Sequence, residues 1–88
     1  MLRLTSLGSG SKGNSLLVTA IDGMHQTTVM FDCGFGIRDI HQRLKQVGCQ
    51  PEELDAVFVT HEHSDHANGI LPLAKRYGIP LWMSNGTF

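Results

Sequence analysis

Histidine and carboxylate side chains are concentrated in one short stretch of this chain, His61-Glu62-His63-Ser64-Asp65-His66. The stretch follows directly after the apolar run Ala56–Val59 and Thr60. Neutral imidazole nitrogens and carboxylate oxygens are the ligands that zinc and similar divalent ions prefer. The residue types therefore predict a metal-binding site, and the candidate ligands are His61, His63, Asp65 and His66.

The backbone must turn irregularly after a strand for these ligands to converge. In a helix, at about 100° per residue, His61 and Asp65 would share one face. His63 and His66 would then point roughly the opposite way, out of reach of the same ion. If a strand instead ends near Thr60, alternate residues project to one side and the turn brings the last two ligands around. Four ligands in so short a segment favour two metals, and ions about 3.5–4 Å apart can hold a bridging hydroxide.

One simpler interpretation of this stretch carries less weight. A solvated polar loop after a buried strand would also be hydrophilic, but loop polarity rarely comes as histidine. Glu62 lies between two ligands in the sequence and is expected to point away from the site. The metal-binding hypothesis therefore leads.

The glycine-rich segment Gly8-Ser9-Gly10-Ser11-Lys12-Gly13 formally matches the dinucleotide-binding fingerprint, with Asp32 about twenty positions later. That fingerprint needs a helix to begin at its last glycine. The residues that follow include Val18 and Thr19, which favour a strand. We therefore expect a hairpin loop, and two roles stay open for it. It is either purely structural, or its polar side chains flank a cleft and contact an anionic substrate: Ser11, Lys12 and Asn14.

Asp32 ends an apolar strand and precedes Cys33 and Gly34. Its carboxylate either accepts hydrogen bonds from loop amides or braces the ligand stretch from behind, as metal sites generally require. The same contacts could serve both roles. Cys33 is expected to be a small buried residue and not a nucleophile.

Hydrophobic periodicity predicts the elements that position these residues. The expected strands cover residues 2–7, 14–20, 27–31, 54–60 and 79–83, and the expected helices cover 37–47 and 70–76. The order β-β-β-α-β-α-β indicates an α/β (α+β) fold. A further helix cap is expected at 84–87, just before the last residue, so we expect residues 1–88 to be the amino-terminal fragment of a single larger domain.

Composition indicates ordinary globular material: 41% of residues are hydrophobic, 17% are charged and the formal net charge is −1. No apolar run approaches eighteen residues, and the amino terminus lacks a signal-peptide pattern. Two cysteines, Cys33 and Cys49, are expected to be reduced thiols. A cytoplasmic protein without a membrane partner is the expectation.

The pattern H-x-H-x-D-H after an apolar strand that ends in Thr resembles the metallo-β-lactamase superfamily. Segments 7–15, 31–34, 59–66 and 73–80 resemble its bacterial WalJ/YycJ-type branch, which is DNA-exonuclease-like. The resemblance implies an αββα sandwich with a two-metal centre at one edge. It also implies that His61 and His63 bind the first metal, that Asp65 and His66 bind the second, and that Asp65 is catalytic because it handles the proton of the bridging water. The remaining ligands would lie beyond Phe88.

The resemblance thus implies a metal-dependent phosphodiesterase or exonuclease acting on DNA, with two divalent ions, zinc first and manganese or iron as alternatives. The 88-residue piece alone is expected to be inactive or nearly so. Three other functions stay open: a thioester or lactone hydrolase of the same superfamily, a non-catalytic module that binds metal or nucleic acid, and a dinucleotide-binding oxidoreductase. A segment without a helix after Gly13 would exclude the last.

Overall fold

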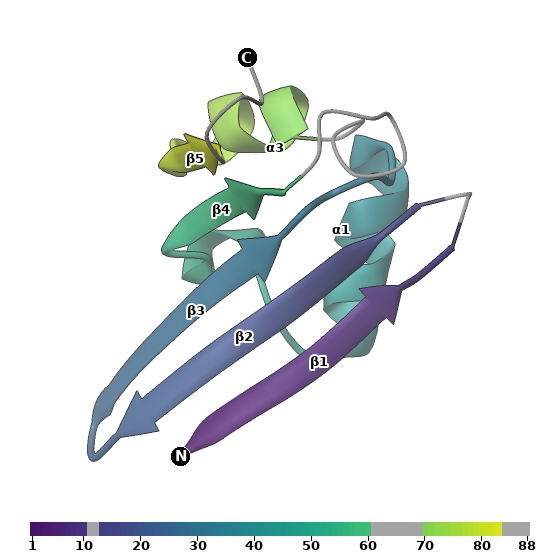
Figure 1. The fold of residues 1–88 in the computed structure, drawn as a ribbon. Helices are drawn as coiled ribbons and strands as arrows, with labels where there is room; N and C mark the ends of the chain where they lie inside the picture. Colours follow the sequence, from purple (N-terminus) through teal and green to yellow (C-terminus); the bar gives the residue numbers. More distant parts are fainter. Residues whose placement is uncertain (11–12, 61–69, 84–88) are drawn as a thin grey trace.

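The computed structural model describes residues 1–10, 13–60 and 70–83, and these form one sheet with helices packed against it (Figure 1). The predicted α/β order is confirmed. The strands are β1 (Leu2–Gly8), β2 (Ser15–Asp22), β3 (His25–Phe31), β4 (Ala56–Val59) and β5 (Leu81–Met83). The helices are α1 (Ile37–Gln46), α3 (Ile70–Tyr77) and the short 3-10 turn η1 (Pro51–Glu53).

Strand order in the sheet follows the chain, β1-β2-β3-β4-β5, but the strand direction changes midway. The first three strands are antiparallel, whereas β3 pairs with β4 and β4 pairs with β5 in parallel. Antiparallel neighbours need only short turns, and the β2–β3 hairpin turns between Asp22 and His25. Parallel neighbours need crossovers, and α1 and α3 lie within these two connections.

The two helices share one face of the sheet, and the core lies between them and the strands (Figure 1). Alternate strand residues such as Leu17, Met30 and Val57 point into it. Ile40 and Leu44 of α1 are fully buried, as the helical spacing predicts. Because successive strand residues face opposite sides, the same alternation sends every second side chain to the other face.

That other face is apolar and uncovered in the described part of the chain. A continuous apolar strand predicts burial on both faces, but along β4 only Val57 and Val59 are buried and Phe58 is half-buried. The strand is also shorter than the predicted range 54–60: β4 covers only Ala56–Val59, and Leu54 forms the C-cap of η1. Large side chains are exposed on this face, among them Leu2, Leu4 and Trp82.

A polar contact joins the two helices. The Tyr77 hydroxyl and the His41 Nε2 are 2.7 Å apart, and the rings meet edge to face at 5.4 Å between centroids. The two partners lie 36 residues apart in the sequence, so the contact fixes α1 relative to α3. None of the described helices has the length and apolar character needed to span a membrane.

Candidate metal centre and its supporting residues

One edge of the sheet gathers several chain segments that are far apart in the sequence. Because β3 and β4 are parallel, Phe31 and Phe58 are register partners and both strands end at this edge. β1 ends and β2 begins at the same edge, with the glycine-rich segment between Gly8 and Ser15. Loops at the carboxyl ends of parallel strands are the usual place for ligand sites in α/β sheets. The candidate site belongs at this edge.

The Asp32 carboxylate holds the start of the predicted ligand stretch. The Thr60 amide donates to Asp32 Oδ1 at 2.7 Å, and the Thr60 hydroxyl donates to Oδ2 at 2.6 Å. The Asp32 amide in turn donates to the Phe58 carbonyl oxygen at 2.8 Å. Asp32 is 7% exposed, and hydrogen bonds to a carboxylate are stronger than those between neutral groups. Thr60, the residue before His61, is thereby fixed to the end of β3.

The backbone at Asp32 is in a conformation that few side chains adopt. Its φ is +65°, and it is the one non-glycine residue with a positive φ among the residues that the structure describes. Aspartate and asparagine tolerate this region better than other non-glycine residues do. The turn is secured from a second side, because the Ser15 hydroxyl donates to the Asp32 carbonyl oxygen at 2.9 Å. The conformation therefore places the carboxylate toward β4.

The glycine-rich segment is tied to the same turn. The Gly34 amide donates to the Asn14 carbonyl oxygen at 3.0 Å. The Asn14 side chain also closes the loop on itself, because it accepts from the Gly10 amide at 3.0 Å and donates to the Gly10 carbonyl oxygen at 2.8 Å. A hollow of about 430 Å³ lies between these segments. It is lined by Ser6, Gly8, Ser9, Asn14, Ser15, Leu16, Phe31, Asp32 and Thr60.

The four predicted ligands, His61, His63, Asp65 and His66, lie outside the described residues, as do Ser11 and Lys12. Within the described ranges, no group of three His, Cys, Asp or Glu side chains could hold a metal. The chemistry of the predicted donors fits a divalent ion, since all four offer imidazole nitrogen or carboxylate oxygen. Their role as ligands and the bracing role of Asp32 stay predictions, and the two bonds from Thr60 support the second.

Sequence reasoning missed two supporting residues. Ser15 was read only as the start of a strand, yet its hydroxyl bonds the Asp32 turn. The i,i+4 spacing of Asp39 and Arg43 predicts an ion pair, and that pair is present at 2.8 Å. Arg43 also reaches Leu7, 36 residues away in the sequence, and no local pattern signals such a contact.

Cys33 follows Asp32 and is fully buried. Its Sγ lies 3.6 Å from the Phe35 carbonyl oxygen. Burial raises the pKa of this thiol from 9.0 to about 12, while a backbone hydrogen bond at Phe35 lowers it in part. A thiolate is the reactive form of cysteine, so a raised pKa makes a poor nucleophile. The expectation that Cys33 is a small buried residue is confirmed, and both cysteines are free thiols.

The raised thiol pKa predicts a loss of stability in alkali. The unfolded chain releases the Cys33 proton above about pH 9 and the folded chain only near pH 12, so stability falls with rising pH between these values. The slope is about 1.4 kcal/mol per pH unit for one thiol. Urea unfolding at pH 8 to 11 should show a shallower slope for Cys33→Ala than for the unmodified chain. Equal slopes would contradict the burial of the thiol.

The dinucleotide-binding alternative is excluded by the local structure. The fingerprint requires a helix to begin at Gly13, but the chain continues as strand β2 from Ser15 to Asp22. No helix N-terminus is therefore present after this glycine to receive a pyrophosphate. The segment is a connection within an antiparallel pair, as expected.

A mixed sheet with helices on one face, and a histidine-rich stretch after a central parallel strand, defines an α/β protein with a predicted divalent metal centre. The chain belongs to the metallo-beta-lactamase superfamily, whose family profile matches residues 8–87. Members of this superfamily use divalent metal ions. The family predicted from the sequence is thus confirmed, and so is the fold class, with the described residues forming one sheet and its helices as a portion of the αββα fold.

Three relatives show the range of this likeness. The exodeoxyribonuclease WalJ of Streptococcus pneumoniae is 37% identical over 82 residues, or 93% of this chain and 29% of the relative. The ribonuclease Z of Aeropyrum pernix is 39% identical over 75 residues, or 80% of this chain and 23% of the relative. The solved Rm3 metallo-beta-lactamase superposes with a TM-score of 0.72 at 25% identity, covering 96% of this chain and 30% of the enzyme. The chain therefore spans less than a third of the length of each of these three relatives.

Proposed function

We propose that this chain provides the first set of metal ligands of a phosphodiesterase that acts on DNA as an exonuclease. His61 and His63 bind one divalent ion, and Asp65 and His66 bind the other. Zinc is the proposed metal, because three of the four donors are imidazoles and zinc also accepts carboxylate oxygen. Manganese and iron are the alternatives. The domain proposed for residues 1–88 is the amino-terminal part of one metallo-β-lactamase fold.

The contact that carries this proposal is the pair of hydrogen bonds from Thr60 to Asp32. A buried carboxylate at the end of β3 fixes the residue that precedes the ligand stretch, which a merely solvated loop would not need. A support of this kind behind the ligands is what metal sites generally require. The WalJ relative, which is similar over 93% of this chain, supports DNA as the substrate.

Each side chain has a distinct task in the proposed reaction. Divalent ions, when bound, lower the pKa of water and stabilise negative charge on a phosphodiester. The three imidazoles bind and orient these ions. Asp65 accepts a proton from the attacking water, and Asp32 keeps Thr60 in place behind the ligands. Asn14, with Ser11 and Lys12, is proposed to contact the phosphate backbone.

RNA is the second candidate substrate, and the ribonuclease Z relative is the observation that favours it. Thioester or lactone hydrolysis and metal binding without catalysis use the same ligand stretch and stay open as alternatives. The side chains named above do not separate these substrates, because all of the reactions need the same ions. Only a direct comparison of substrates distinguishes the alternatives.

The deciding experiment is a chimera in which this chain replaces the matching 82 residues of the WalJ relative. End-labelled DNA, RNA and a thioester are supplied separately with zinc or manganese, and the relative without this segment is the control. We expect progressive shortening of DNA from an end. A chimera that binds metal but hydrolyses none of the three would establish the non-catalytic alternative, and hydrolysis of RNA or the thioester alone would overturn the DNA assignment.

A further inference from the structure

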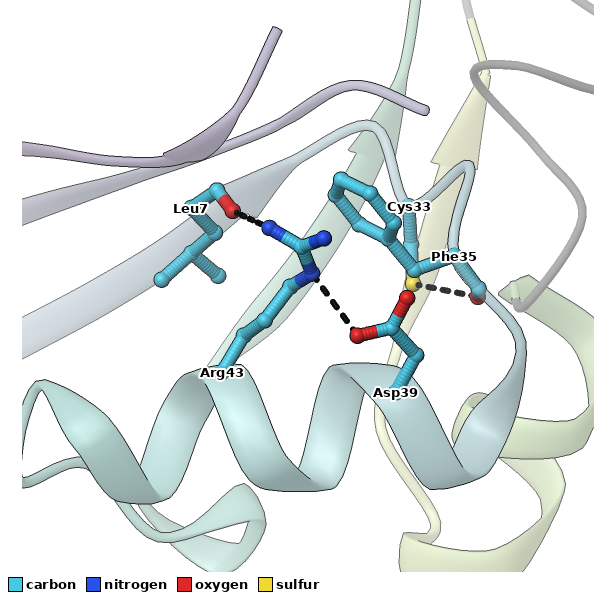
Figure 2. Close-up of polar contacts among 5 residues, drawn as sticks. All are labelled: Leu7, Cys33, Phe35, Asp39 and Arg43. Atoms are coloured by element: carbon cyan, nitrogen blue, oxygen red, sulfur yellow. Dashed lines mark hydrogen bonds and ion pairs between the residues drawn. The ribbon is translucent and has the colours of Figure 1, made fainter. Parts of the chain in front are cut away.

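Arg43 makes three contacts at once from the middle of α1 (Figure 2). Its Nε donates to Asp39 Oδ1 at 2.8 Å, one helical turn earlier. Its Nη1 donates to the carbonyl oxygen of Leu7, near the end of β1, at 2.6 Å. Its guanidinium also stacks on the ring of Phe35, with 3.7 Å from Cζ to the ring centroid. The side chain therefore joins three chain segments: α1, the end of β1 and the turn after β3.

The Phe35 ring fills the space that a side chain on the glycine-rich segment would need. A Cβ placed on Gly8 would lie 2.5 Å from Phe35 Cζ, and a Cβ on Gly13 would lie 2.5 Å from Phe35 Cε1. Both distances are far below van der Waals contact, so a ring in this position requires glycine at both places. Phe35 itself is 6% exposed. One aromatic ring is thus held between the glycine-rich segment and the Arg43 guanidinium.

This packing is continuous with the support behind the predicted ligands. Phe35 follows Gly34, whose amide bonds to Asn14 at the end of the glycine-rich segment. Three residues before Phe35, the Asp32 carboxylate holds Thr60. A shift of the ring would therefore disturb both the segment that lines the hollow and the turn that carries Asp32. Loss of the Arg43–Asp39 salt bridge alone would not disturb these two segments. The two side chains are 35% and 50% exposed, and exposed ion pairs contribute little to stability.

We propose that Arg43 is a positioning residue that clamps Phe35 against Gly8 and Gly13, and so fixes the Asp32 turn and Thr60 ahead of the metal ligands. The inference rests on the proposed function only in its last link, from Thr60 to the metal. Lysine could not replace arginine here. A planar guanidinium can stack on a ring while donating sideways in two directions, whereas an ammonium is a compact point charge.

The test compares Arg43→Lys and Arg43→Met with Arg38→Met in the 88-residue chain. Arg38 is an exposed arginine on the same helix, so its variant controls for loss of charge. Amide hydrogen exchange by NMR is followed at Gly10, Gly34 and Thr60, with β2 and β3 amides as reporters of global opening. Zinc affinity is measured separately in the WalJ chimera by competition with a chromophoric chelator, because the proposed centre takes only its first set of ligands from this chain.

Both Arg43 variants should exchange about tenfold faster at Gly10, Gly34 and Thr60 than the control variant, with little change at the sheet centre. Their zinc affinity should fall about tenfold, the lower end of the range for outer-shell support. Exchange equal to that of Arg38→Met would overturn the inference, and so would faster exchange with unchanged zinc affinity. If the WalJ chimera with the unmodified segment binds no zinc, the proposed metal centre fails, and the exchange data alone then decide whether Arg43 positions the turn.

Discussion

Replacing Asp65 with alanine in the WalJ chimera is expected to lower turnover on DNA by roughly 10²- to 10³-fold. The reason is that Asp65 is proposed to serve twice, as a ligand of the second metal and as the acceptor of the water proton. Charge stabilisation by a bound divalent ion contributes several kcal/mol to such a reaction, and 1.4 kcal/mol corresponds to a factor of ten. Bound zinc should fall from two ions to one per molecule.

The neighbouring carboxylate provides the control for this experiment. Glu62→Ala removes a charge of the same sign from the same stretch but is expected to leave metal content and turnover nearly unchanged, because Glu62 is predicted to point away. Metal content is measured by elemental analysis and turnover by release of labelled nucleotides. Catalysis by this centre would be untenable if Asp65→Ala kept full turnover, or if Glu62→Ala and Asp65→Ala lost it equally.

Replacing Asp32 with alanine is expected to lower both the stability of the fold and its zinc affinity. The variant loses two hydrogen bonds from Thr60 to a charged acceptor, each worth about 1.5–3 kcal/mol when well buried. Alanine at a φ of +65° adds about 1 kcal/mol of strain. Thr60 is itself exposed, which weakens these bonds, so we expect a total loss of about 2–4 kcal/mol in urea unfolding. Zinc affinity should fall about 10- to 100-fold.

Asp55 offers a matched control at the opposite end of β4. Its Oδ2 accepts a hydrogen bond from the Thr28 amide at 2.8 Å, so Asp55→Ala also breaks a carboxylate–backbone contact between neighbouring chain segments. That variant should lose stability but keep its zinc affinity. Asparagine tolerates the same φ as aspartate. The Asp32→Asn variant should therefore have a stability and a zinc affinity between those of the unmodified chain and those of Asp32→Ala. If Asp32→Ala and Asp55→Ala bound zinc equally well, Asp32 would have no role beyond folding.

The elements were predictable where a local period determines them. The spacing of Ile37, Ile40 and Leu44 predicted α1, and the structure ends the helix at Gln46, one residue before the predicted end. The start of β4 was misplaced because the 3-10 turn at Pro51–Glu53 has no period of its own. The apolar run at 54–60 does not show that only one face of β4 is buried. Burial of each face depends on which segments cover the sheet.

For the candidate site, too, some features were predictable from the sequence and others were not. The donor types in the ligand stretch point to a metal without any structure, and Asp32 was identified from its place at a strand end. The contacts that hold these residues join distant positions: 28 residues separate Asp32 from Thr60, and 36 separate Leu7 from Arg43. A single sequence carries no local signal of such pairs, so the roles of Ser15, Phe35 and Arg43 emerged only from the three-dimensional arrangement.

The long separation between Asp32 and Thr60 also bears on the order in which the chain assembles. The β2–β3 hairpin closes a short loop and can form early, whereas β4 joins β3 only after α1 and η1 have brought it back. Contacts between residues that are distant in the sequence form late in folding. The chain must first lose the conformational entropy of the loop between them, and only then does the contact contribute stability. We therefore expect the edge with the proposed metal centre to form last, so that a nascent chain would bind metal ions only once the first three strands and α1 have packed together.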